Sequence, residues 1–197
     1  MTASSISDTL PEQLTTSSAE AEELHLIAQA KKGCADSFRQ LVERHQQPIY
    51  RFCLHYLHDS DDALEASQDT FVRAHRALGR FHPRTRLSSW LFRIALNLCR
   101  DRLRKKRHST VCLDGQDWSC HRAHPDQSAI HQGDLAKLDR GLRALPTRLR
   151  DVLVLSCLDG HSHAECAEIL NCSERAIEGR LYRARQRLLH WWENEPT

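Results

Sequence analysis

The chain contains the segment Ser88-Ser-Trp-Leu-Phe-Arg-Ile-Ala-Leu-Asn-Leu-Cys-Arg-Asp-Arg-Leu-Arg-Lys-Lys-Arg107, which joins an apolar helical stripe to a strongly basic end. The apolar side chains recur at helical spacing: Trp90, Leu91, Ile94, Ala95, Leu98 and Leu103. The polar and basic side chains fall mostly outside that stripe: Arg93, Asn97, Arg100, Arg104 and Lys105-Lys106-Arg107. The pattern predicts a helix that packs on one face and meets a polyanion on the other. The alternative is an ordinary amphipathic surface helix with solvated charges.

The composition of the 197-residue chain is typical of a globular protein, with 27% charged and 40% hydrophobic residues. Its formal net charge of +2 conceals a segregation of charge. Residues 1–30 contain acidic side chains and no Lys or Arg, whereas residues 100–107 are almost wholly basic. Because a local basic surface attracts phosphate, nucleic acid is the expected partner. No apolar run approaches the ~20 residues of a membrane-spanning helix and no secretory signal is present, which predicts a cytoplasmic protein without membrane insertion.

The eight cysteines of a chain without an export signal are expected to be reduced thiols. Several of them fall on apolar helical faces, where Cys acts as a small hydrophobic residue: Cys53, Cys99, Cys157 and Cys166.

The periodicity predicts an all-α protein with two small helical domains joined by a flexible linker. Residues 1–18 are rich in Ser and Thr and are expected to form a disordered leader. Residues 19–107 are expected to form four helices, the last of them capped by Ser88 or Ser89. Residues 108–134 lack periodicity and are expected to be the linker, and residues 135–197 have only helical signatures.

The second domain contains the signature of a helix-turn-helix. Ser162-His-Ala-Glu165 is a capping box that opens one helix, Asn171-Cys172 can turn, and Ser173 can cap a longer helix that runs to about Trp192. The longer helix carries many charged side chains that can reach phosphates and base edges in a major groove. The alternative is a plain helical hairpin without a DNA-reading role.

With both domains considered, the chain resembles the extracytoplasmic-function group of bacterial RNA polymerase sigma factors, which keep only conserved regions 2 and 4. The first-domain motifs are Asp62-Ala-Leu-Glu65, Gln68-Asp-Thr-Phe71, Trp90-Leu-Phe-Arg-Ile94, Asn97 and Asp101-Arg-Leu-Arg104. The second-domain motifs are Leu145-Pro146, Arg150, Gly160, Glu165, Ala167, Leu170, Ser173, Ile177 and Arg180-Leu-Tyr-Arg-Ala-Arg185. The resemblance covers about residues 24–107 and 135–190.

The resemblance implies a subunit that binds core RNA polymerase and directs promoter recognition, strand opening and transcription initiation. It implies a polymerase-docking face of Asp62, Glu65, Gln68 and Asp69. It implies minus-ten contacts from the loop 80–87 and the following helix: Arg84, Arg86, Arg93, Asn97, Arg100, Arg104 and Lys105. It implies minus-thirty-five contacts from Ser173, Arg175, Glu178, Arg180, Tyr182 and Arg183. Because Trp90 begins the apolar stripe, we expect it to pack in the core rather than to stack on a base.

Two departures from the family pattern affect these expectations. Glu178 places an anion where a basic or neutral residue is more usual, so it either accepts from a cytosine amino group or repels unsuitable sequences. Leu64, Ala66 and Ser67 replace an acidic residue and larger apolar ones on the docking helix, which predicts docking that differs in detail.

The linker has two interpretations. Its acids, Asp114, Asp117, Asp126 and Asp134, suit the family's path toward the polymerase active site, and they equally suit a solvated tether. Its Cys112, Cys120, His121 and His124 are candidate zinc ligands, but their spacing lacks the usual close Cys pair. A second Cys and His cluster lies around the turn between the last two helices. We expect no metal and no cofactor.

Three functions remain open from the sequence. The leading one is a sigma factor without catalytic activity, with an anti-sigma factor as a further partner that the sequence leaves undecided. The rivals are a stand-alone helix-turn-helix regulator that dimerises and a metal- or thiol-responsive sensor. An enzyme is the weakest reading, because no nucleophile and base pair or phosphate-binding glycine loop is present and the chain has only seven glycines.

Overall fold

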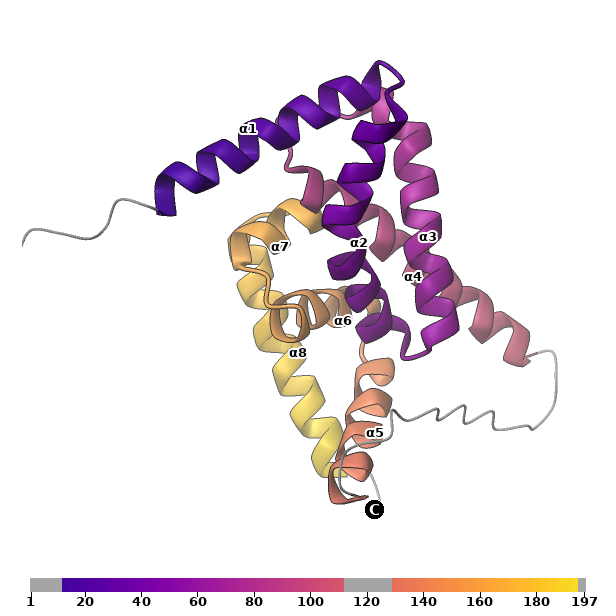
Figure 1. Ribbon diagram of the computed structural model, residues 1–197. Helices are drawn as coiled ribbons and strands as arrows, with labels where there is room; N and C mark the ends of the chain where they lie inside the picture. The colour runs from indigo at the N-terminus through magenta and orange to yellow at the C-terminus, as the bar shows by residue number, and fades with distance from the viewer. Residues whose placement is uncertain (1–11, 112–128, 195–197) are drawn as a thin grey trace, which may run out of the picture.

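The computed structural model describes the backbone of residues 12–111 and 129–194 and the side chains of residues 19–106 and 137–194. All regular structure in these ranges is helical, which confirms the predicted all-α class (Figure 1). The first domain contains α1 Glu12–Lys31, α2 Ala35–Leu57, α3 Ser60–Ala77, a short 3-10 turn Leu78–Arg80, and α4 Leu87–Val111. The second contains α5 Ala129–Ala144, α6 Thr147–Leu153, a π-helical turn Val154–Leu158, α7 His163–Leu170 and α8 Glu174–Asn194. None of the described helices is long and apolar enough to cross a membrane.

Three helix ends differ from the sequence expectation. Helix α1 already begins at Glu12, so residues 12–18 of the expected leader are helical, while residues 1–11 lie outside the described part. Helix α4 continues to Val111 and α5 starts at Ala129, so helices occupy both ends of the expected linker. The physical reason is that a polar composition without apolar periodicity does not break a helix unless Pro or several Gly residues intervene. Gly133 lies inside α5 at a cost of about 1 kcal/mol.

The start of α4 also corrects the expected cap. The helix begins at Leu87, which places Ser88 and Ser89 inside its first turn rather than at the cap position. The Ser89 hydroxyl donates a hydrogen bond to the Glu168 carboxylate at 2.8 Å instead of capping its own helix. The hydrogen bond to Glu168 of the second domain therefore determines what Ser89 does in the structure.

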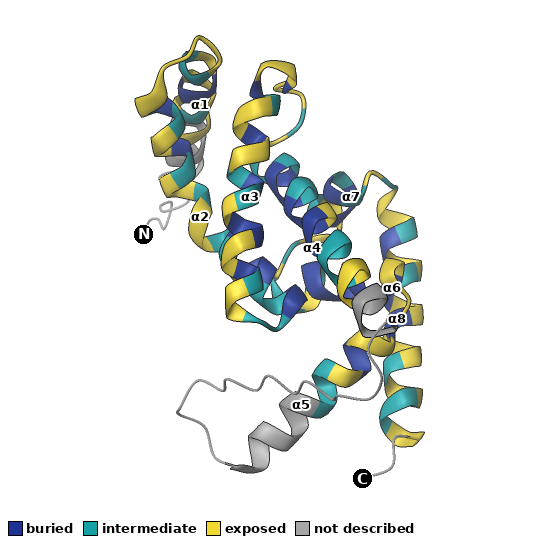
Figure 2. Ribbon diagram, turned by 90° about the vertical axis from the view of Figure 1, so that its right-hand side faces the viewer, coloured by how far each residue is buried: buried dark blue, intermediate teal, exposed yellow. Residues whose placement is uncertain are grey.

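The apolar core runs continuously from the first domain into the second. Phe52 and Leu96 of the first domain belong to the same buried cluster as Leu155 and Ile169 of the second. Helix α7 packs against α4 (Figure 2), and the π-helical turn packs against α2. The two domains therefore bury apolar side chains against each other, which favours their association in water.

The helix-turn-helix predicted from the sequence is present. Ser162 and Glu165 form a complete capping box at α7, and Asn171 takes the left-handed conformation (φ 50°) that ends this helix. Ile177 and Leu181 are buried and seat α8 on α7. These contacts hold α8 in a defined orientation on α7.

A smaller cluster fixes the far end of α8. Leu142, Leu145, Leu149, Leu153 and Ala184 join α5, α6 and α8. At Gly141 an added Cβ would lie 2.7 Å from Cδ1 of Leu188, so glycine allows the close approach of α5 and α8.

Candidate nucleic-acid interface

Helix α8 displays a charged face to solvent. Arg175, Glu178, Tyr182 and Arg183 are all exposed, and Tyr182 exposes 67% of its surface. Their spacing places them along one side of the helix, opposite the buried Ile177, Leu181 and Ala184. The structure therefore groups four of the six side chains for which the sequence predicted minus-thirty-five contacts.

The other two side chains of that set lie elsewhere. The Ser173 hydroxyl accepts a hydrogen bond from the backbone N–H of Ala176 at 3.3 Å, so it caps α8 as predicted. The Arg180 guanidinium is half-buried and donates to the Cys172 Sγ at 3.5 Å. Arg180 thus contacts the turn between the two helices rather than extending from the exposed face of α8.

The basic residues of α4 and of the loop before it fall into two groups. Arg84, Asn97, Arg104 and Lys105 are exposed, and the Asn97 amide oxygen accepts from Arg100. Arg93 and Arg100 are half-buried, and their guanidinium groups contact the second domain. Arg86 is exposed as a side chain, although its backbone N–H and guanidinium also contact α7. The sequence did not reveal this division, because it depends on where the second domain packs.

Asp151 on α6 is the most buried acid at this contact, with 1% of its surface exposed. Its Oδ2 accepts from Arg100 at 2.6 Å, and its Oδ1 accepts from the Tyr56 hydroxyl at 2.6 Å. Burial lowers the pKa of Arg100, but the hydrogen bond and charge of Asp151 outweigh it, so the net pKa is raised. Burial, followed by the charge of Asp151, raises the pKa of the Tyr56 phenol, which keeps it a neutral donor. The buried carboxylate is therefore paired and hydrogen-bonded from both sides.

Histidines line the same contact between the domains. The Asp159 carboxylate lies 3.0 Å from Nδ1 of His55, and the Asp139 carboxylate lies 3.1 Å from Nε2 of His58. The ring of His161 meets the ring of Phe92 edge-on, with the centroids 4.4 Å apart. Burial raises the pKa of Asp159. Sequence analysis missed these residues as interface residues, because nothing local marks a histidine as a partner for the other domain.

The predicted docking face on α3 is partly engaged with α4. Asp69 and Glu65 pair with Arg102 at 3.0 and 3.3 Å, Asp62 pairs with Lys106, and Gln68 is exposed. Leu64 and Val72 on the same helix are 51% and 47% exposed. The sequence marked Leu64 only as a departure from the family pattern and gave no signal for Val72. The exposed face of α3 combines these apolar side chains with acidic ones, a combination that suits docking to a partner.

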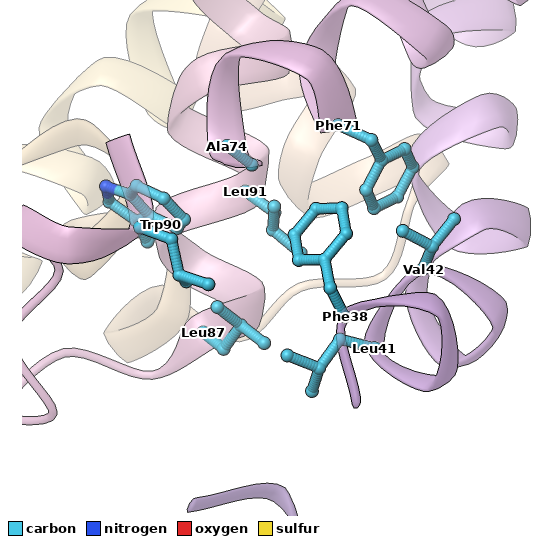
Figure 3. A pocket seen from close by; sticks show the side chains of 9 residues that line it. Phe38, Leu41, Val42, Phe71, Ala74, Leu87, Trp90 and Leu91 are labelled. Carbon is cyan, nitrogen blue, oxygen red and sulfur yellow. The ribbon is translucent and has the colours of Figure 1, made fainter. Parts of the chain in front are cut away.

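Trp90 packs in the first domain, as expected from its place in the apolar stripe. Its ring lies 5.0 Å from that of Phe81, and it lines an apolar hollow with Phe38, Leu87 and Leu91 (Figure 3). The hollow has a volume of about 10 Å³, enough for about one water molecule. It is therefore too small for a nucleobase.

The cysteines divide between core and surface. Cys53, Cys99 and Cys166 are buried as predicted, and burial raises the pKa of Cys166 to about 12. Cys157 is exposed, so its predicted core role is wrong: the π-helical turn places it outward, 3.8 Å from the Arg185 guanidinium. Among the described residues, no group of three or more His, Cys, Asp or Glu side chains could hold a metal. The candidate ligands Cys112, Cys120, His121 and His124 lie outside the described residues.

Comparisons with known proteins agree with this architecture. Residues 41–109 match the family model of Sigma-70 region 2, and residues 135–188 match that of Sigma-70 region 4. The chain is 34% identical over 170 residues to the ECF RNA polymerase sigma factor SigM of Mycobacterium tuberculosis, covering 86% of this chain and 84% of that protein.

Two solved structures share the fold. One is CnrH, an RNA polymerase sigma factor of Cupriavidus metallidurans, in complex with the cytosolic domain of CnrY. It has a TM-score of 0.65 and 32% identity, covering 89% of this chain and 99% of that one. The other is the sigma factor RpoE of Bartonella quintana with the anti-sigma factor NepR. It has a TM-score of 0.62 and 25% identity, covering 82% of this chain and all of that one (100%).

The two helical domains, one of them a helix-turn-helix, together with the two family matches, place the chain in the class of DNA-binding transcription initiation factors. The chain belongs to the sigma-70 family and is a promoter-recognition sigma factor of the ECF group. The matches do not favour a stand-alone regulator or a metal- or thiol-responsive sensor.

Proposed function

We propose that the two domains divide promoter recognition between them, the first reading the minus-ten element and the second the minus-thirty-five element, to start transcription of a specific regulon. One observation carries the division: each family segment contains a long helix with basic side chains, α4 in the region 2 match and α8 in the region 4 match. The exposed face of α8 can enter a major groove. The loop 80–87 and α4 supply the contacts to the melting strand.

We assign core polymerase docking to the outer face of α3. Gln68 is exposed there beside the apolar Leu64 and Val72, and the acids Glu65 and Asp69 are partly exposed. The chain acts in the cytoplasm, where polymerase and promoter DNA are found, and has no catalytic activity of its own. Because the fold relative from Bartonella quintana is bound to an anti-sigma factor, a partner of that kind is also proposed for this chain.

Run-off transcription with purified core polymerase tests the proposal. The chain is expected to direct initiation at discrete start sites, which sequencing of the transcripts maps to shared upstream elements, while core polymerase alone yields none. A chain that fails to bind core polymerase and instead recognises a symmetric operator unaided would refute it.

Co-purification with core polymerase tests the docking face. The double variant Glu65→Lys, Gln68→Ala is expected to lose affinity, because it reverses a charge and removes a polar contact on α3. The matched control Gln40→Ala, Glu43→Lys makes the same changes on exposed positions of α2 and is expected to bind normally. Equal recovery of both variants would contradict the assignment.

A further inference from the structure

Helix α1 ends beside the loop that precedes α4. Leu26 and Ile27 of α1 are buried in the core of the first domain, with 7% and 4% of their surface exposed. The helix also packs against the 3-10 turn Leu78–Arg80, from which the loop starts. The Glu23 carboxylate lies 2.8 Å from Nε2 of His45 and so joins α1 to α2. The last turn of α1 is therefore fixed relative to the start of the loop.

Lys31, in the last turn of α1, makes two contacts with one residue of this loop. Its Nζ donates a hydrogen bond to the backbone carbonyl of Phe81 at 2.5 Å. The same Nζ lies 5.7 Å from the centroid of the Phe81 ring, within the range of a cation–π interaction. The two contacts therefore bind both the main chain and the side chain of Phe81 to α1.

Phe81 stands where the 3-10 turn ends and the loop begins. Its side chain is buried, and its ring lies 5.0 Å from that of Trp90. At the other end of the loop Leu87 is buried as well. Between these two ends His82 and Arg84 are exposed. The loop is thus anchored on both sides, while its middle is open to solvent.

The loop has cations of its own. Arg80, Arg84 and Arg86 are exposed, and the sequence from residue 70 to residue 100 contains no Asp or Glu. The Nζ of Lys31, by contrast, is engaged by Phe81. A loop that is held in one conformation before binding loses less entropy when it captures a ligand. Lys31 therefore contributes order to the loop rather than charge to its exposed surface.

We propose that Lys31 is a positioning residue for the minus-ten element, which acts through Phe81 to hold the loop 80–87 in the conformation that reads the melted strand. The inference rests on the proposed function, because that function gives the loop its part in reading. Lys31 itself does not contact DNA. Loss of its ammonium group therefore weakens the discrimination between minus-ten sequences and leaves the minus-thirty-five preference of the second domain unaffected.

The test is transcription by the full-length chain with core polymerase from two promoter libraries. Both are built on a promoter mapped by run-off transcription, one randomised at the minus-ten element and the other at the minus-thirty-five element, and a transcribed barcode identifies each member. Lys31→Met keeps the apolar stem but has no donor. It is expected to lower the preference for the best minus-ten sequence over the average one about three- to tenfold. Its minus-thirty-five preference is expected to equal that of the wild type.

Two further variants serve as controls. Lys31→Arg keeps a cationic donor and is expected to retain most of the minus-ten preference. Lys32→Met removes the same charge from the neighbouring exposed residue and is expected to behave as the wild type. In all variants the slope of log affinity for promoter DNA against log salt concentration is expected to stay unchanged, because neither lysine contacts a phosphate. Melting curves by circular dichroism confirm that the variants are folded.

Several results would overturn the inference. In Lys31→Met they are an unchanged minus-ten preference and a loss of preference at both elements. In Lys32→Met or Lys31→Arg it is a loss equal to that of Lys31→Met. A salt slope that falls in magnitude by about one in Lys31→Met would also overturn it, because Lys31 would then bind a phosphate directly.

Failure of the inference is distinct from failure of the proposed function. A wild-type chain that selects no minus-ten sequence refutes the proposed function, and the inference falls with it. A wild-type chain that selects such sequences, with a Lys31→Met variant that selects them equally well, keeps the proposed function and loses only the role of Lys31.

Discussion

Helices α4 and α8 carry similar basic side chains but present them in opposite ways. The charged face of α8 is exposed from Arg175 to Arg183. The corresponding face of α4 is hydrogen-bonded to the second domain at Ser89, Arg93 and Arg100, whereas Asn97, Arg104 and Lys105 are exposed. The comparison shows that the number of basic residues does not measure how much of a helix a polyanion can reach.

Asp151→Asn is expected to have the largest effect, because Asp151 binds Arg100 where α4 contacts the second domain. The substitution removes the charge that pairs Arg100 and that accepts from Tyr56 in a buried position. Because Arg100 is partly solvated, we expect a loss of about 2 to 3 kcal/mol in the free energy of unfolding, measured by urea denaturation. The control Asp101→Asn removes an exposed pair with Arg104 and should cost less than about 0.5 kcal/mol. Similar losses in the two variants would show that burial does not distinguish these acids.

The double variant Arg104→Ala, Lys105→Ala probes the exposed end of α4. We expect the affinity of the polymerase-bound chain for promoter DNA to fall about tenfold, by the same factor on all promoters. The slope of log affinity against log salt concentration should decrease in magnitude by about two. Filter binding over a series of NaCl concentrations measures both. The control Lys32→Ala, Arg39→Ala removes two exposed charges from the turn after α1 and from α2, and it should leave the slope unchanged. A loss confined to certain promoters would mean that these residues read bases.

Glu178→Ala probes the exposed face of α8. We expect a change in which minus-thirty-five sequences are accepted, by about 1 to 2 kcal/mol at the affected base pair, because the carboxylate can accept from a cytosine amino group or repel other bases. Selection from a library randomised at the minus-thirty-five element, followed by sequencing, measures the preference. An unchanged preference would remove Glu178 from the set of reading residues.

Ser162→Ala is expected to have the smallest effect, because it changes only the cap of α7. This helix supports α8 and also carries Glu168. Loss of the cap should lower the free energy of unfolding by about 1 kcal/mol, measured by urea denaturation. The control Ser60→Ala changes a serine that follows the true cap Asp59 and should have little effect. No difference between these variants would argue against the capping box as a source of stability.

Acid titration examines the same cap. The backbone hydrogen bond from Ser162 lowers the pKa of Glu165. A lowered folded-state pKa means that this stabilisation is present above the ordinary pKa of Glu and is lost as the pH falls through the lowered value. The Ser162 hydroxyl donates a second hydrogen bond to the same carboxylate, at 2.9 Å. Ser162→Ala removes only this second bond, so the acid-dependent loss of stability should be only slightly smaller than in the wild type.

Local features of the sequence were sufficient for several parts of the structure. The capping box at Ser162 and Glu165 and the turn at Asn171 depend on residues within one or two helical turns, and helical periodicity was enough to place Cys53 and Cys99 on apolar helix faces. The all-α class and the helix-turn-helix follow from the same kind of information.

Other expectations failed because long-range contacts decide them. Cys157 lies at a helical spacing that predicts an apolar face, yet the π-helical turn Val154–Leu158 places it outward, where it is exposed. Ser89 has the composition of a cap but donates to a carboxylate 79 positions away along the chain. Neither outcome can be derived from local propensity, because both depend on how the helices pack in three dimensions.

Hydrophobic periodicity and caps were enough to specify the helices, the turn before α8 and the basic character of α4, since these are short-range properties of the chain. The packing of the domains decided which of those basic groups face solvent and which meet Glu168 and Asp151. The reason is that a charge is identified by its own residue, whereas its accessibility depends on atoms brought close by folding from distant parts of the chain.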